Sequence, residues 1–482
     1  MKDRTVGLPE IPTNIDLSKT SNDLPYLKCS YYSASRPTLP SLLTFESMRR
    51  TLLILCAAAL ALMAQVPDPE LSRYIGLIRA IDNHAHPMRL LQPGEKSDPD
   101  VDALPADGIE EGPSPVRGRT DNPELVPLWR ELYAYPYDDA TPAHLAELET
   151  LRARVIAAKG EGYPSWILDR MGIDIMLSNR IALGAGLSPA RFKWISFVDA
   201  LMYPLDNSQL KRLTPDRKVF FADEERLLKR YLGSGKLPAT LDAYVGMVTA
   251  TMEKMKREGA VGVKFEMAYL RTLEVEDVPR DTAAAVYGRF VKGGAPPPAA
   301  YKKLQDYLFR VIALEAGRLG LPVQIHTMAG GLGSYFVSAG ANPLLLEPLF
   351  NDPALRKTKF ILIHTGEPWN KLTRSLFGKP NVYADISAQT TTLYPRALGA
   401  LIRDWLEQYP ERVLFGTDAF PTNDKGGWEE FGYLAAVTAR KALAIALTGM
   451  LEDGEITRVR AHELADMVMR GNALAVYSLK DR

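Results

Sequence analysis

Short apolar runs of the kind expected for buried strands recur along most of the chain, separated by long loops or by stretches with helical periodicity. Helical periodicity covers residues 242–258, 304–318 and 398–408, each ending shortly before the next apolar run, and a last helical stretch covers residues 457–477. The eight apolar runs are residues 77–86, 172–178, 192–200, 260–267, 321–327, 359–365, 381–387 and 412–418.

Strands that alternate with helices predict a parallel sheet, and eight such units favour a closed barrel over an open sheet. We therefore expect an α/β fold, a (β/α)8 TIM barrel, over residues 66–482. Long insertions follow strands 1, 3 and 4, at residues 87–165, 201–240 and 272–303, and the last contains GGAPPP, which cannot form regular structure. Because a barrel binds substrates at the carboxyl ends of its strands, these insertions are expected to wall a pocket for a small molecule.

The N-terminal part of the chain differs in composition from the rest. Residues 1–47 are rich in Pro, Ser and Thr and have no periodicity, which is typical of a disordered extension. If translation starts at Met48, these residues are not translated. Residues 48–65 combine Arg49 and Arg50 with an apolar stretch, the layout of a secretory signal peptide. A helix packed on the barrel is the alternative. The signal predicts a periplasmic or secreted protein without a stable membrane anchor, because the stretch is short for a bilayer span.

Charge and cysteine content narrow the chemistry. Lys plus Arg and Asp plus Glu both number 58, so no basic surface is predicted and nucleic acid is not expected as a partner. The two cysteines, Cys29 and Cys56, both precede the predicted barrel. Metal ligands in the barrel would therefore be imidazoles and carboxylates, without thiolates or disulfides. The sequence does not determine the oligomeric state, and a homo-oligomer is one possibility.

Four of the six histidines stand at the ends of predicted strands: His84 and His86 on the first, His326 on the fifth and His364 on the sixth. Asp418 ends the eighth. One His-x-His pair is weak evidence, since solvated or core histidines are common, but five such residues at strand ends favour a metal site. Imidazoles with a carboxylate suit Zn²⁺ and are also open to Mn²⁺, Fe²⁺ or Co²⁺.

These ordered motifs, HAH, IHT, IHT and GTD, resemble the amidohydrolase superfamily, specifically its amidohydrolase-related (amidohydrolase 2) branch, over residues 77–478. The stretches VGVKFEMAYLR and IHTMAGGLGSYFVSAGANPLLLEPLF are similar to the amidohydrolase domain fused to glutamine synthetase in some proteins. The resemblance implies a metal-dependent hydrolase with one or two divalent ions, zinc first and Mn or Fe as alternatives.

The resemblance also implies roles for individual residues. His84, His86 and His326 would bind the metal, and Asp418 would contact it and accept a proton from the attacking water. His364 would either bind a second metal or polarise the substrate. The chemistry is consistent, since a bound cation acidifies water and polarises a carbonyl while a carboxylate takes up the proton.

Two further residues have open assignments. Alternation along the fourth strand places Lys264 and Glu266 on one side, so that Lys264 points into the barrel. A neutral Lys264 could become a carbamate that bridges two metals, as in several branches of the family, or a protonated Lys264 could pair with Glu266 or a substrate anion. Arg271 could hold a substrate carboxylate, or be solvated or ion-paired.

The sequence therefore predicts an enzyme that cleaves an amide, lactone or related bond in a small molecule. A metal-dependent decarboxylase or other lyase on the same barrel is the first alternative. A binding protein without catalysis is the second, and it predicts loss of site residues, which the sequence does not show.

Overall fold

The computed structural model describes residues 66–91, 94–98, 102, 115–233, 235–328, 337–423 and 425–481. The predicted extension, residues 1–47, and the predicted signal peptide, residues 48–65, lie outside these described residues.

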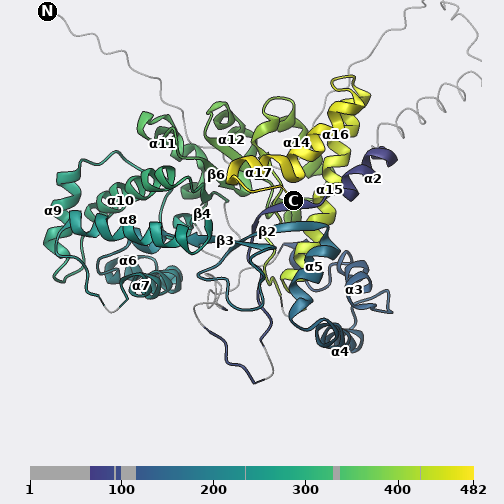
Figure 1. Cartoon of the computed structure of the whole chain (residues 1–482), viewed down its shortest axis with the longest axis horizontal. Helices are drawn as coiled ribbons and strands as arrows, with labels where there is room; N and C mark the ends of the chain where they lie inside the picture. Colours follow the sequence, from purple (N-terminus) through teal and green to yellow (C-terminus); the bar gives the residue numbers. More distant parts are fainter. Residues whose placement is uncertain are drawn as a thin grey trace, which may run out of the picture. The chain divides into compact units, whose positions relative to one another are not determined.

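All eight predicted strands are present and form one parallel sheet in the order β1 to β8, with helices around it (Figure 1). Asn83 N donates to Phe415 O at 2.9 Å and His86 N donates to Ala419 O at 2.8 Å, so the segment after β8 joins β1 and the sheet closes. The predicted TIM barrel is confirmed. The strands are β1 (Ala80–Ala85), β2 (Ile173–Asn179), β3 (Phe192–Phe197), β4 (Ala260–Phe265), β5 (Val323–His326), β6 (Phe360–Ile363), β7 (Val382–Asp385) and β8 (Val413–Leu414).

Helices connect most of the strands. They are α2 (Pro69–Leu77), α3 (Leu125–Tyr133), α4 (Pro142–Lys159), α5 (Tyr163–Met171), α6 (Ser208–Leu213), α7 (Lys218–Leu232), α8 (Leu241–Arg257), α9 (Arg280–Phe290), α10 (Pro298–Leu319), α11 (Glu347–Asn351), α12 (Asn370–Thr373), α13 (Gln389–Thr392), α14 (Pro395–Leu406), α15 (Trp428–Glu452), α16 (Arg458–Asp466) and α17 (Asn472–Tyr477).

The three predicted internal helices are confirmed as α8, α10 and α14, and local chemistry sets their ends. The Thr240 side chain accepts a hydrogen bond from Ala243 N at the start of α8. Gly320, with φ of 65°, ends α10 in the left-handed conformation that favours glycine. The predicted last helix, residues 457–477, consists of α16 and α17 joined by a π-helical turn at Met467–Gly471.

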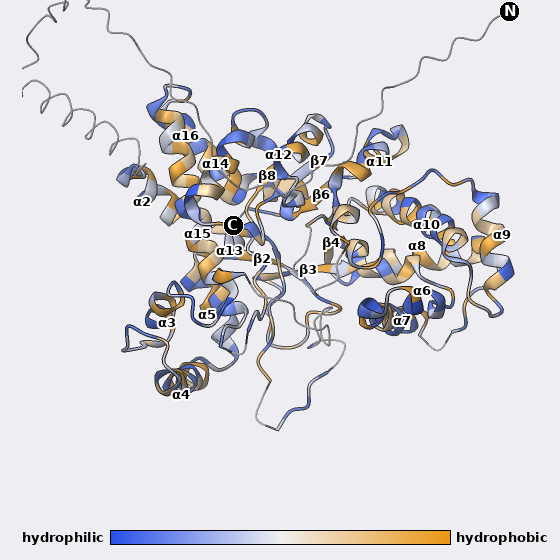
Figure 2. Ribbon diagram, turned by 180° about the vertical axis from the view of Figure 1, so that it is seen from behind, coloured by the Kyte–Doolittle hydropathy of each residue, from blue (hydrophilic) through white to orange (hydrophobic). Residues whose placement is uncertain are grey.

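Helix α15 was not predicted, because its apolar residues lie on most of its faces and give no clear amphipathic period. By length and composition alone it could cross a membrane, but 72% of its most apolar window is buried inside the protein. Helix α15 is therefore a core helix of the barrel domain. Helices α8 and α10 instead mix hydrophobic and hydrophilic stretches (Figure 2).

The predicted insertions contain more regular structure than their composition suggested. The insertion after β1 includes α3 and α4, and the one after β3 includes α6 and α7. Residues 293–297 of the GGAPPP segment are irregular, as predicted. By contrast, the connection from β2 to β3, residues 180–191, contains no helix.

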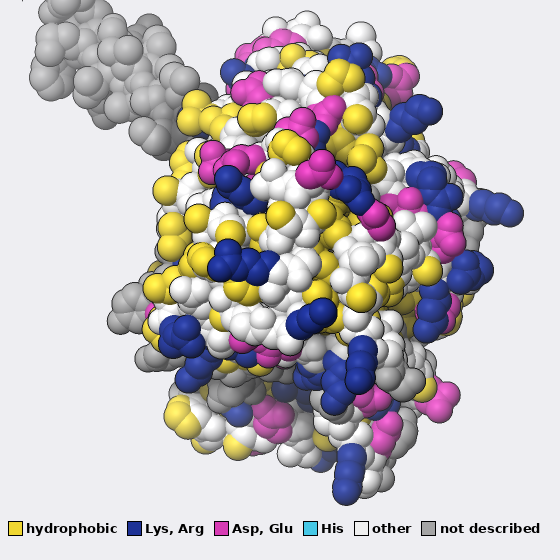
Figure 3. Space-filling view, turned by 90° about the vertical axis from the view of Figure 1, so that its left-hand side faces the viewer, with side chains coloured by type: hydrophobic (Ala, Val, Ile, Leu, Met, Phe, Trp, Pro, Cys, Tyr) yellow, Lys and Arg dark blue, Asp and Glu magenta, His cyan; other side chains and the backbone are white. Residues whose placement is uncertain are grey.

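The barrel interior has an apolar half and a polar half. Seven inward-facing aliphatic residues form the apolar half, and α17 packs against them through Ala473, Val476 and Tyr477. The seven are Ile81, Ile175, Leu177, Ile195, Ile361, Ile363 and Leu414. The polar half lies at the carboxyl ends of the strands. On the outer surface, the face shown in Figure 3 has cationic and anionic side chains interspersed, without a large patch of one charge.

Candidate metal centre

The five predicted metal-site residues stand at or just beyond the carboxyl ends of four strands. His84 lies in β1 and His326 ends β5. The predicted sixth and eighth strands are shorter than expected, so His364 and Asp418 lie in loops beyond β6 and β8. Both adopt the left-handed backbone conformation, with φ of 65° and 55°. Non-glycine residues in this conformation are uncommon and concentrate at functional sites.

The structure brings three of the histidines to one carboxylate. His84 Nε2 lies 3.2 Å from Asp418 Oδ1, and His86 Nε2 lies 3.6 Å from the same oxygen. His364 Nε2 lies 3.9 Å from Asp418 Oδ2. The fourth histidine, His326, has its ring centroid 4.8 Å from that of His364. We call these five residues the metal centre.

Hydrogen bonds on the far side of the rings fix which nitrogen of His84 and His86 holds the proton. His84 Nδ1 lies 3.3 Å from Gln324 Oε1, an acceptor because the Gln324 Nε2 group donates to Asn83 O. His86 Nδ1 lies 3.2 Å from the carbonyl oxygen of Asn179. Both Nδ1 atoms must therefore donate, so in the neutral rings both Nε2 atoms present lone pairs toward Asp418.

His364 has the same tautomer for a similar reason. Its Nδ1 lies 2.9 Å from Ser387 Oγ, and that hydroxyl donates its single proton to Asp385 Oδ1 at 2.7 Å. Ser387 must then accept from His364 Nδ1, which leaves the His364 Nε2 lone pair facing Asp418. In this tautomer His364 can bind a cation or accept a proton, but it cannot donate a hydrogen bond to a substrate carbonyl.

Burial keeps these imidazoles neutral. Burial lowers the pKa of His84, His86 and His326 well below the usual histidine range, and the Lys264 charge adds to that effect for all three. Burial also lowers the pKa of His364 to about 3, against an opposing effect of Asp418. Neutral imidazole is the form that binds metal ions.

The residues present fit a divalent cation. Three lone pairs face a carboxylate across 3.2 to 3.9 Å with no proton available to bridge them. Among the described residues, the buried Nε2 atoms of His84 and His326 also have no hydrogen-bond partner. Leaving buried polar atoms unpaired is costly, and His84, His364 and Asp418 offer ligand atoms within 4.8 Å of one another that could share a cation.

Lys264 lies within the barrel beside the metal centre, as alternation along the strand predicted. Its side chain is 1% exposed, and its Nζ lies 3.8 Å from Glu266 Oε1. Asp199, two residues beyond the end of β3, accepts a hydrogen bond from Glu266 N at 2.8 Å. Burial raises the pKa of Glu266 to about 7, and burial with the Glu266 charge raises that of Asp199 to about 8. The short distance between Lys264 and Glu266 corresponds to the ion-paired alternative, and a carbamate on Lys264 stays a prediction.

The structure does not place Arg271 with the metal centre. Its guanidinium donates to Asp306 Oδ1 at 2.5 Å, to Gln305 Oε1 at 3.2 Å and to the carbonyl oxygen of Glu274 at 2.5 Å. Asp306 is fully buried in α10. These contacts correspond to the ion-paired alternative, and a substrate-binding role for Arg271 stays a prediction.

Sequence reasoning missed several residues around the centre. Gln324, Asn179 and Tyr477 form a buried hydrogen-bond layer beneath the histidines, in which Tyr477 donates to Asn83 Oδ1 at 2.7 Å. Arg180, at the end of β2, is 2% exposed, and its charge lowers the pKa of His86 together with burial and His84. The available signal was the position of Asp199 and Arg180 at strand ends, the same signal that identified the histidines.

Comparisons with known proteins agree with this fold. Residues 243–479 match the family described as Amidohydrolase. A candidate metal-dependent hydrolase from Lactobacillus casei has 16% identity and a TM-score of 0.54, covering 85% of this chain and 97% of its own. A uronate isomerase from Thermotoga maritima has 15% identity and a TM-score of 0.52, covering 85% of this chain and 98% of its own.

A glucuronate isomerase from Caulobacter crescentus has 16% identity and a TM-score of 0.55, covering 86% of this chain and 94% of its own. No curated protein matches the chain. At these identities the solved structures show a shared fold. The chain is therefore similar to the Amidohydrolase family over residues 243–479 and shares the barrel fold of these solved structures.

Proposed function

We propose that this protein is a metal-dependent hydrolase that activates water to cleave an amide, lactone or related bond in a small molecule. The observation that carries the proposal is the convergence of three Nε2 lone pairs on the Asp418 carboxylate. We propose zinc as the ion, because imidazoles with one carboxylate and no thiolate suit it, with Mn or Fe as alternatives.

His84, His86, His326 and Asp418 would hold the ion, with His364 as a further ligand. A divalent ion bound there supplies an acidified water and polarises a substrate carbonyl. Asp418 accepts the proton of the attacking water, since its carboxylate lies at the focus of the rings. Ser387 and Asp385 hold His364 in the tautomer that keeps its Nε2 free of a proton. The charge of Lys264 stays paired with Glu266 and favours binding of an anionic substrate group.

The number of ions follows from the surroundings of Lys264. Lys264 lies at ion-pair distance from Glu266, and a lysine engaged in this pair does not form a bridging carbamate, so we propose one ion per chain. The finer resemblance to the domain fused to glutamine synthetase stays a prediction.

The experiment that tests the function combines metal analysis with a substrate panel. Purified protein with bound zinc would be incubated with N-acyl amino acids, dipeptides, lactones and uronates in ¹⁸O-labelled water. Incorporation of one ¹⁸O atom into a cleaved product is expected. Carbon dioxide release without incorporation would instead indicate a decarboxylase. Conversion of a uronate to an isomeric sugar acid would indicate an isomerase, a reaction named for two of the structurally similar proteins.

We also propose that the protein is exported, on the basis of the signal-like residues 48–65. N-terminal sequencing of the protein from its native host is expected to start shortly after residues 61–65. A cytoplasmic product that retains residues 48–64 would contradict export.

A further inference from the structure

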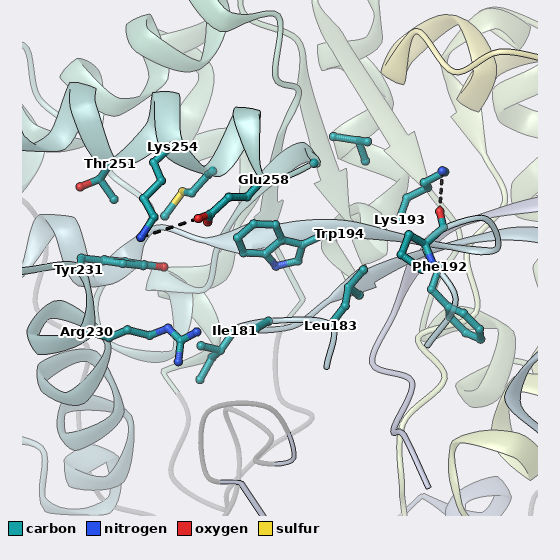
Figure 4. Close-up of a pocket in the computed structure, with 15 residues that line it drawn as sticks. Ile181, Leu183, Phe192, Lys193, Trp194, Arg230, Tyr231, Thr251, Lys254 and Glu258 are labelled. Atoms are coloured by element: carbon teal, nitrogen blue, oxygen red, sulfur yellow. Dashed lines mark hydrogen bonds and ion pairs between the residues drawn. The ribbon is translucent and has the colours of Figure 1, made fainter. Parts of the chain in front are cut away.

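A cleft of about 570 Å³ lies on the outer face of the barrel beside β3 (Figure 4). None of the residues that line it belongs to the metal centre. Residues 180–191 connect β2 to β3 without a helix. Because no helix of this connection packs on Trp194 of β3, its side chain lines an open cleft. The walls come from α7 and α8, which follow β3 in the sequence.

Two aromatic rings in this cleft are fixed by hydrogen bonds. Trp194 Nε1 donates to Arg180 O at 2.8 Å, and the Tyr231 hydroxyl donates to Phe197 O at 2.6 Å. The polar atoms of both side chains are therefore engaged within the protein. What the two side chains offer to the cleft is their apolar ring surface, which suits a flat, unsaturated partner.

The charged groups of the cleft are mostly cationic. Arg230 of α7, Lys254 of α8 and Lys193 of β3 line it, against one carboxylate from Glu258. Lys254 Nζ lies 3.8 Å from Glu258 Oε1, and the two side chains are 66% and 53% exposed. An exposed pair at this distance is weak, so it leaves Lys254 able to bind another anion. In Figure 4 Lys254 and Arg230 lie on either side of the Tyr231 ring, at one end of the cleft.

We propose that this cleft binds a small planar organic anion. The unsaturated ring system lies against Trp194, and its acid group binds Arg230 and Lys254. The volume is in the range of small-molecule sites. The proposal is independent of the reaction at the metal centre, because it rests on residues that the centre does not use.

The test measures binding of 1-anilinonaphthalene-8-sulfonate to the full chain with its metal bound, by fluorescence and calorimetry. The test variant is the double substitution Arg230→Gln and Lys254→Gln. The matched control is Lys229→Gln and Lys256→Gln, which removes two cations from the same helices at exposed positions that do not line the cleft. N-phenyl-1-naphthylamine, which lacks the sulfonate, is the neutral comparison probe.

The expected result is saturable binding of one probe per chain, weakened about tenfold by the Arg230/Lys254 substitutions, which corresponds to ~1.4 kcal/mol. The Lys229/Lys256 control should bind as the unchanged protein does, and the neutral probe should bind more weakly. The Asp418→Asn variant should keep full binding, since it alters only the metal centre. Equal affinity in both double variants, or no saturable binding, would overturn the proposal.

Discussion

The two halves of the barrel interior show how one set of strands provides both stability and chemistry. In one half, residues such as Ile361 and Leu414 fill the space with aliphatic side chains sealed by α17. In the other half, the same strands or the loops just beyond them supply the buried His84 and His364 and the partly buried Asp418. Burial of the aliphatic half stabilises the folded protein. Burial of the polar half destabilises it unless a cation binds the histidine lone pairs. Substitutions in the two halves should therefore have separable effects.

The largest effect is expected from Asp418→Asn. The amide keeps the side-chain volume but cannot accept the proton of the attacking water, so turnover should fall by about 10²- to 10⁴-fold. The free energy of unfolding should change little. Asp281→Asn is the control, because Asp281 is 94% exposed and distant from the centre in the sequence. Near-normal turnover of Asp418→Asn, measured with the identified substrate, would remove Asp418 from the mechanism.

Substitution in the aliphatic half should have the opposite pattern. Ile361→Ala leaves a cavity in the fully buried cluster and is expected to lower the free energy of unfolding by about 2 to 5 kcal/mol. Metal content and turnover per folded molecule should be unchanged. Leu314→Ala, at a position that is 43% exposed, is the matched control. Denaturant unfolding and metal analysis on the same samples check both statements, and loss of metal without loss of stability would break the comparison.

A smaller effect is expected from Ser387→Ala, which removes the acceptor that fixes the His364 tautomer. Metal affinity should fall about 10- to 100-fold, the usual result when a partner of a metal-binding histidine is lost. Ser375→Ala is the control, because the Ser375 hydroxyl donates only to a local carbonyl oxygen at an exposed site. Competition with a fluorescent chelator measures the affinity. Unchanged affinity would mean that Ser387 does not orient a ligand.

The smallest change in metal content is expected from Lys264→Met. If Lys264 pairs with Glu266, both the natural protein and the variant should bind about one ion per chain. A carbamate would instead give two ions in the natural protein and one in the variant. Elemental analysis of both proteins separates these outcomes, with Lys256→Met as a control at an exposed position.

The sequence alone determined the barrel and the meeting of His84, His364 and Asp418 at one end of it. Buried strands leave a local hydrophobic pattern, and all eight runs became strands. Histidines at the ends of those runs had to meet, because the carboxyl ends of parallel strands share one end of a barrel. The same reasoning placed Lys264 inside the barrel beside them.

Only the tertiary structure decided the protonation pattern and the surroundings of these residues. The partner of His84 is Gln324, 240 residues away, and the carboxylate that holds Glu266 N comes from Asp199 after another strand. The cleft beside Trp194 depends on a connection that lacks a helix. Hydrophobic periodicity is a local property of the chain, whereas hydrogen-bond partners and neighbouring charges depend on which distant segments the fold brings together.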